Sequence, residues 1–150
     1  MQARGEKDRR RRLRLVIVLY SASALCALAI NLWINSWNPG MTARPDGRSL
    51  AVLALCFASA ALVLGTLPVT LRNLSAQMRR RGSTPTEIAG ARPGVAARMG
   101  GFLIIGAVVV TSSAGWTWGS VFYGISALFL LYLLFLYRSY VKAASEGTEA

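Results

Sequence analysis

The sequence predicts an all-α integral membrane protein of four transmembrane helices, arranged as two helical hairpins with both ends in the cytoplasm. Hydrophobic residues make up 54% of its 150 residues and charged residues 15%, whereas soluble domains have about 25% charged residues. The charges gather in short basic clusters, and long charge-free stretches separate these clusters. These stretches have the length and composition of membrane spans.

Residues 1–14 contain seven basic residues and show no apolar repeat, so we predict a flexible basic cytoplasmic tail. The next 23 residues, 15–37, carry no charge. A signal peptide also begins with basic residues, but its apolar region has only about 7–15 residues. We therefore expect residues 15–37 to form the first span, because about 20 apolar residues suffice to cross a membrane.

The second span is predicted at residues 49–71, which again are 23 residues without a charge. Asn38, Pro39 and Gly40 precede it and favour a turn after the first span. Pro68 lies near the end of the second span and is expected to bend the helix, because proline removes a backbone donor.

The longest polar stretch covers residues 72–98. Leu71, Leu74 and Met78 have helical spacing, which predicts that the second span continues as a short helix on the membrane surface.

A helix start is predicted inside this polar stretch. Thr84, Pro85 and Glu87 have the order of a capping box with proline at the first helical position. Gly90 and the Pro93-Gly94 pair are expected to end this helix after about two turns.

Residues 99–137 contain no charge and would be nearly 60 Å long as one helix, about twice the hydrocarbon thickness. They must therefore contain two spans, which we place at residues 95–114 and 118–137. Between them, Gly115 and Gly119 are interpreted as turn residues. The membrane domain is then residues 15–142, and residues 143–150 form a polar cytoplasmic tail.

The orientation follows from the basic residues. With four spans, the side that holds both termini and the middle loop carries 15 of the 17 Lys and Arg residues. By the positive-inside rule that side is the cytoplasm. The aromatic residues expected at the interfaces agree with this arrangement: Trp33, Trp37, Trp116 and Trp118 at the outer boundary, and Tyr137 and Tyr140 at the inner one.

Arg98 lies at the start of the third span, and we expect its side chain to snorkel to the headgroups. Apart from it, the four spans contain no Asp, Glu, Lys, Arg or His. Ion-coupled transporters and proton relays depend on such residues within the membrane. The chain has no histidine, and its cysteines and carboxylates do not cluster, so no metal and no cofactor is expected. We expect no enzyme activity, because a nucleophilic Ser or Thr would lack a base within the membrane.

The first span carries a polar stripe in which Ser23, Ala27, Asn31 and Asn35 recur every four residues. Ser23, Asn31 and Asn35 could face a cavity or a partner. Alternatively, they could form hydrogen bonds between helices of the same bundle, which contribute about 0.6 kcal/mol on average in membranes.

The second span carries a stripe of small residues, Ala54, Ala58, Ala61 and Gly65. Small side chains let helix backbones approach closely in lipid. Packing within the chain and packing against a second protein explain the stripe equally well at this stage.

Basic clusters on the predicted cytoplasmic side favour contact with anionic lipid headgroups, at about 1 kcal/mol for each residue near the surface. Span orientation explains the same charges, and nucleic-acid binding is not expected. The excess of Arg over Lys, with abundant Ala and Gly, is typical of a GC-rich bacterial genome. The residues expected to contact lipid are Arg9, Arg10, Arg11, Arg12, Arg14, Arg79, Arg80 and Arg81.

These patterns favour a noncatalytic multi-pass protein of the cell membrane that packs against another membrane protein as an accessory, assembly or immunity-type subunit. The alternative is a small homo-oligomeric transporter or pore, in which the polar stripe of the first span lines the path.

Overall fold

The computed structural model describes residues 2–37 and 47–146, and this part of the chain consists of four helices. The predicted turn at residues 38–40 lies outside the described residues. All four helices are long and apolar enough to cross a membrane. They are α1 (Gln2–Trp37), α2 (Gly47–Arg80), α3 (Pro85–Ala114) and α4 (Trp116–Glu146).

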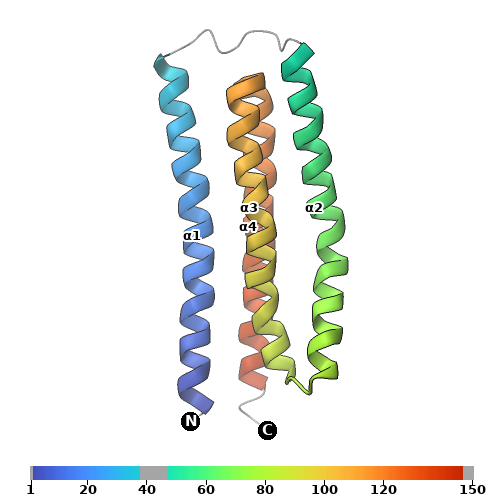
Figure 1. The fold of residues 1–150 in the computed structure, drawn as a ribbon. Helices are drawn as coiled ribbons and strands as arrows, with labels where there is room; N and C mark the ends of the chain where they lie inside the picture. The colour runs from blue at the N-terminus through green and yellow to red at the C-terminus, as the bar shows by residue number, and fades with distance from the viewer. Residues whose placement is uncertain (1, 38–46, 147–150) are drawn as a thin grey trace.

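The centre of the bundle is the pair α3 and α4, with α1 and α2 on opposite sides of it (Figure 1). Helix α1 packs on both central helices, whereas α2 packs chiefly on α3. The prediction of two packed hairpins is therefore not confirmed, because α1 and α2 are separated by the central pair. Helix α1 begins and helix α4 ends at the same end of the bundle (Figure 1).

The basic segment before the first span is helical, so the prediction of a flexible tail over residues 1–14 was wrong for the part described. Arg, Lys, Glu and Gln are good helix formers, and extending an existing helix costs far less than starting one. Leu13 is buried within this segment. The basic segment thus continues the helix of the span and packs on the bundle.

Helix α2 runs on to Arg80 without a separate surface segment. Leu71 and Ser75 are buried in this extension, so it packs on the bundle. It ends in a Schellman motif, in which Ser83 N donates to Met78 O (3.0 Å) and Gly82 has a φ of 76°.

Helix α3 begins with the predicted capping box. Thr84 N donates to Glu87 Oε2 (2.9 Å), and Glu87 N donates to Thr84 Oγ1 (3.3 Å). The predicted end near Gly90 and Pro93 was wrong, because α3 continues to Ala114. Both residues are buried against neighbouring helices, and this packing outweighs their poor helix propensity.

A single residue, Gly115, connects α3 to α4 and has a φ of 88°, as a chain reversal of this kind requires. The sequence had suggested that Gly119 is a turn residue, and this prediction was wrong. Gly119 lies within α4 and is buried against Thr111 of α3, where an added Cβ would overlap the threonine side chain.

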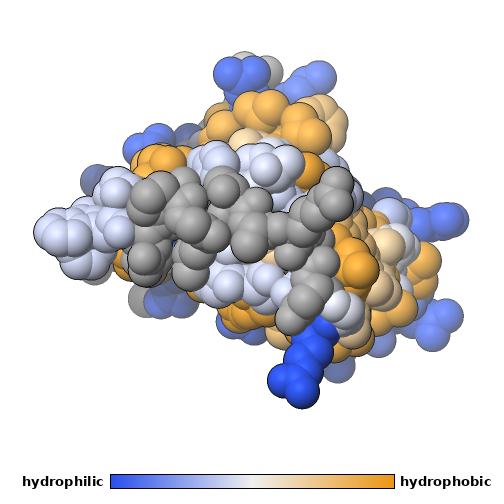
Figure 2. All heavy atoms as spheres, turned by 90° about the horizontal axis from the view of Figure 1, so that it is seen from above, coloured by the Kyte–Doolittle hydropathy of each residue, from blue (hydrophilic) through white to orange (hydrophobic). Residues whose placement is uncertain are grey.

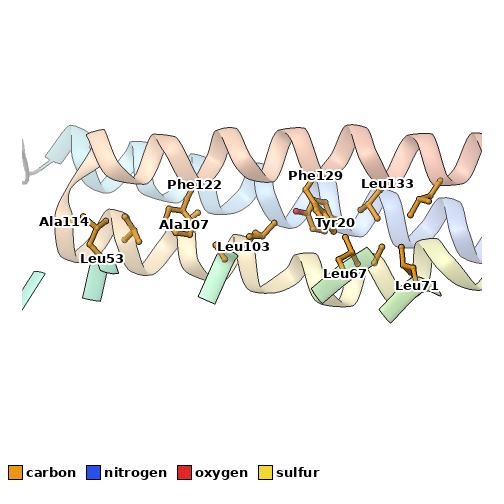
Figure 3. Close-up of a cluster of buried hydrophobic side chains, with 14 residues drawn as sticks. Tyr20, Leu53, Leu67, Leu71, Leu103, Ala107, Ala114, Phe122, Phe129 and Leu133 are labelled. Carbon is orange, nitrogen blue, oxygen red and sulfur yellow. The ribbon is translucent and has the colours of Figure 1, made fainter. Parts of the chain in front are cut away.

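The core is built mainly from the facing surfaces of α3 and α4, with contributions from α1 and α2 (Figure 3). Aromatic rings of α4 fit where α3 has glycine. A Cβ added at Gly100 would overlap the ring of Phe129, and one added at Gly106 would come within 3.0 Å of Phe122. Phe122 and Phe129 are 1% and 4% exposed. This fit of rings to glycines holds the central pair together.

The outer helices are much less buried than the central pair. In the apolar stretch that could cross the membrane, buried residues make up 39% in α3 and 33% in α4, but only 17% in α2 and 11% in α1. Seen from above, hydrophobic side chains are visible around the edge of the bundle, with hydrophilic ones projecting beyond them (Figure 2). Such hydrophobic side chains suit lipid or another transmembrane helix, because neither solvates polar groups.

Candidate interaction surfaces

The small-residue stripe of α2 points away from the rest of the chain. Ala54, Ala58, Ala61 and Gly65 are all exposed, and nothing lies within 4 Å of a Cβ built on Gly65. The buried residues of α2 lie on another face, which packs on α3: Leu53, Ala60, Leu67, Leu71 and Ser75.

A ridge of larger side chains borders this stripe. Leu55, Leu62 and Val69 follow one another at seven-residue intervals, and they are 68%, 68% and 57% exposed. A groove of small residues beside a ridge of branched ones is the surface relief that helices use when they pack side by side. The outward side of α2 therefore has the shape of a helix-packing surface, but none of the helices within residues 2–37 and 47–146 covers it.

The polar stripe of α1 is divided between two environments. Asn31 is 5% exposed, and its Nδ2 donates to the Tyr123 hydroxyl of α4. Ser23 is exposed. The side chain of Asn35 lies outside the described residues. The structure thus brings Asn31 into the bundle and does not bring Ser23 to the same site.

Further polar contacts join α1 to α4. Arg14 Nε donates to the Tyr137 hydroxyl (2.8 Å) near the basic end of the bundle. Tyr20 and Ser126 are buried in the same interface, but their hydroxyl groups make no hydrogen bond there. Helix α1 has the fewest buried residues of the four described helices, so the hydrogen bonds of Arg14 and Asn31 help to fix its position against α4. The tyrosines of α4 were not identified as partners of the polar stripe from the sequence.

The Asn31 contact supports a prediction about stability. Asn31→Leu should lower the free energy of unfolding by about 0.6 kcal/mol, the average for one interhelical hydrogen bond in a membrane protein. Unfolding of the detergent-solubilised protein would measure it. Tyr123→Phe should have a similar effect, and the double variant should lose no more than either single one.

Ser23→Ala is the matched control and should leave stability unchanged, because Ser23 is exposed. A loss several times larger for Asn31→Leu than for Tyr123→Phe would contradict the assignment of Asn31 to this hydrogen bond.

The arginines predicted to contact lipid differ in exposure. Arg11, Arg12, Arg14 and the cluster Arg79, Arg80 and Arg81 are exposed, while Arg9 and Arg10 are partly buried. Arg9 lies against α3, since a Cβ added at Gly90 would come within 2.9 Å of its Cδ. Some of the basic residues of α1 therefore also contribute to packing.

Arg92 of α3 was not singled out by the sequence. Its Nε and Nη2 donate to Ser75 Oγ of α2 (3.1 and 2.9 Å), and Ser75 Oγ donates to Leu71 O (2.7 Å). Ser75 is 6% exposed. This contact fixes one guanidinium group between α2 and α3, close to the turn that joins them.

The four tryptophans and two of the tyrosines lie toward the two ends of the bundle. Trp33 and Trp37 end α1, and Trp116 and Trp118 begin α4, so all four tryptophans lie at the end where α3 joins α4 (Figure 1). Trp33 and Trp37 contact each other with ring centroids 6.0 Å apart. Tyr137 and Tyr140 lie toward the opposite end of α4. This distribution is typical of the aromatic belts of membrane proteins.

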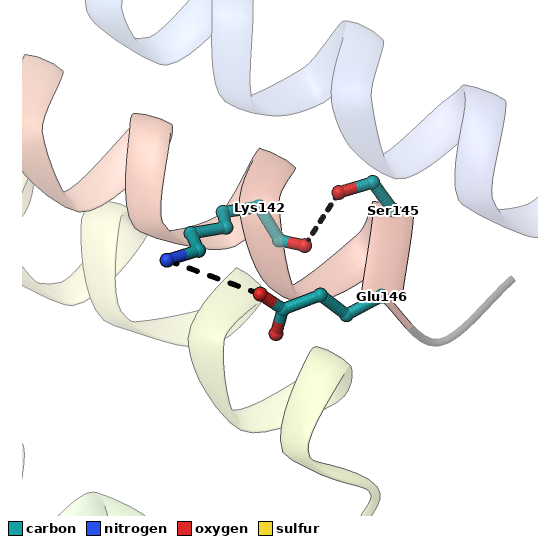
Figure 4. A network of polar contacts seen from close by, with 3 residues as sticks. All are labelled: Lys142, Ser145 and Glu146. Atoms are coloured by element: carbon teal, nitrogen blue, oxygen red, sulfur yellow. Dashed lines mark hydrogen bonds and ion pairs between the residues drawn. The ribbon is translucent and has the colours of Figure 1, made fainter. Parts of the chain in front are cut away.

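The end of α4 carries an ion pair between Lys142 and Glu146, with the two charged atoms 3.9 Å apart (Figure 4). Ser145 Oγ donates to Lys142 O (2.7 Å) beside it. Both charged side chains are more than 60% exposed, so the pair contributes little to stability and marks no site.

Among the residues that the structure describes, no group of three or more His, Cys, Asp or Glu could hold a metal ion. Glu87 is engaged in the capping box of α3, and Asp46 lies outside the described residues. The chain matches no known protein family, no curated protein and no solved structure.

Proposed function

We propose that the protein is a noncatalytic multi-pass membrane protein that acts as an accessory, assembly or immunity-type subunit. In this proposal its α2 helix packs against a transmembrane helix of another membrane protein. The observation that carries the proposal is the outward direction of the small-residue stripe. The sequence left two explanations of this stripe open, and packing within the chain is not supported, because the stripe takes no part in the contacts between the described helices.

The stripe suits a helix partner better than it suits lipid. In a bilayer there is little hydrophobic gain from helix association, so helices associate through close packing of small residues. Ala54, Ala58, Ala61 and Gly65 offer such packing over about three turns of α2, and the ridge of Leu55, Leu62 and Val69 lies alongside.

The pore alternative gains no support from the polar stripe of α1. Asn31 is buried and bonded to Tyr123, so its amide is not free to line a path between copies of the chain. Ser23 is exposed on α1, whereas Asn31 is buried, so the two residues do not form one polar surface. We therefore do not propose transport as a second function.

The test is to purify the full chain in a mild detergent and to identify what accompanies it. One heterologous membrane protein, in a fixed ratio to the chain, is the expected result. A homo-oligomer with no second protein would contradict an accessory role.

The proposed location is the plasma membrane of a bacterium, with both termini and residues 72–98 in the cytoplasm. Fifteen of the 17 basic residues are then cytoplasmic. A reporter that is active only outside the cytoplasm should be active when fused after Arg44 and inactive when fused after Ala150. Activity after Ala150 would contradict this orientation.

A further inference from the structure

A small pocket opens at the turn between α2 and α3, at the end of the bundle where α1 begins and α4 ends. It has a volume of about 280 Å³ and is lined by Arg79, Ser83, Pro85, Ile88, Ala89 and Arg92. Binding sites for drug-sized molecules occupy about 300–1,000 Å³. The pocket is therefore suited to a small group or to the head of a larger molecule.

The two arginines give the pocket its chemistry. A guanidinium group has five N–H donors, and Arg92 uses those on Nε and Nη2 for Ser75 Oγ. Its remaining donors are held in position by this contact and are available to a ligand. Arg79 contributes a second guanidinium group from α2.

No carboxylate among the described side chains lies within ion-pair distance of Arg79 or Arg92. The nearest acid along the chain, Glu87, accepts a hydrogen bond from Thr84 N in the capping box. The pocket also lies beside the N-terminus of α3, where the helix dipole favours a negative charge. The guanidinium donors and the N-terminus of α3 favour an anion with several acceptor oxygens, and they act against the C-terminal dipole of α2, whose last turn also lines the pocket.

We propose that this pocket binds a phosphate group, which Arg92 and Arg79 hold through charge-assisted hydrogen bonds. The group could belong to the headgroup of an anionic lipid or to a soluble phosphate compound. Arginine suits this role because its planar fork matches the oxygens of phosphate. Ser75 is a positioning residue, because it acts on the ligand only through Arg92.

The experiment measures binding of a short-chain phosphatidic acid to the full-length protein in a neutral detergent, with inorganic phosphate as the competitor. Saturable binding of one molecule per chain is expected. Arg92→Gln should weaken it by about tenfold or more, because a charged hydrogen-bonding partner is lost. Ser75→Ala should also weaken it, although this change leaves the net charge of the protein unaltered.

Arg80→Gln is the matched control, because it removes one charge from the same basic cluster and Arg80 does not line the pocket. It should change the affinity by no more than about twofold, as expected for screened surface charges. Competition by inorganic phosphate would show that the phosphate group alone is sufficient for binding, and failure to compete would show that the rest of the lipid is also required.

Equal losses for Arg92→Gln and Arg80→Gln, together with no loss for Ser75→Ala, would overturn the proposal. That result would show attraction to the basic surface as a whole. Binding that does not saturate would overturn it as well. Elution volume and thermal stability of each variant would show that the fold is kept, and Arg92→Lys gives a second test that retains the charge and loses the planar fork.

Discussion

Ala58→Leu and Gly65→Leu should each reduce recovery of the partner protein by about tenfold or more, because Leu side chains would hold the two helix backbones apart. Neither side chain would disturb the chain itself, since both positions are exposed and no atom lies within 4 Å of a Cβ on Gly65. The measurement is the amount of partner that accompanies each variant in mild detergent.

Ala127→Leu is the matched control for this prediction. It makes the same change at an exposed alanine on α4, away from the stripe, and should leave partner recovery unchanged. The thermal stability of all three variants should match that of the original protein. Equal recovery for all variants would mean that the stripe of α2 reflects only the alanine-rich composition of the chain.

Gly100→Ala should destabilise the bundle by about 1–3 kcal/mol, the usual cost of adding a methyl group to a filled core. The new methyl group would overlap the buried ring of Phe129, which has α1 on its other side through Tyr20, with ring centroids 5.9 Å apart. Unfolding of the detergent-solubilised protein would measure the loss.

Gly101→Ala makes the same change at the next residue of α3 and serves as its control. Nothing lies within 4 Å of a Cβ on Gly101, so the better helix propensity of alanine should leave stability equal or slightly raised. If both variants lost stability equally, the close approach of Phe129 to Gly100 would not be what holds α3 and α4 together.

The four long apolar helices could be predicted because charge and hydropathy are segregated along the chain, although α1 and α3 begin well before the predicted spans. A run of 23 uncharged residues predicts a span whatever its neighbours are. The capping box at Thr84 could also be predicted, because the interaction involves residues only three apart. Where local rules alone decide the structure, as at these positions, the prediction and the structure agree.

The prediction failed where contacts between distant residues decide the structure. Gly90 and Pro93 favour a helix end in isolation, but packing keeps α3 continuous through them. Gly119 resembles a turn residue in sequence, yet its role is to admit Thr111. A comparison of α3 with α4 could have indicated the fit of Phe129 to Gly100, since one helix has glycines where the other has aromatic rings.

The candidate surface could be predicted only in part. The sequence identified the stripe of Ala54, Ala58, Ala61 and Gly65, but not the direction in which it points. That direction depends on which face of α2 packs on α3, and several faces of an apolar helix are equally hydrophobic. Ser75 and Arg92 are 17 residues apart, so their contact, and the pocket next to it, required the arrangement of α2 and α3.

The most direct measurement is photo-crosslinking in intact cells, with a photoreactive amino acid in place of Ala61 or, as the control, Ala127. We expect one discrete adduct from position 61 that contains a second membrane protein, and no such adduct from position 127. No adduct from position 61, the same adducts from both positions, or an adduct of two copies of this chain alone would contradict it.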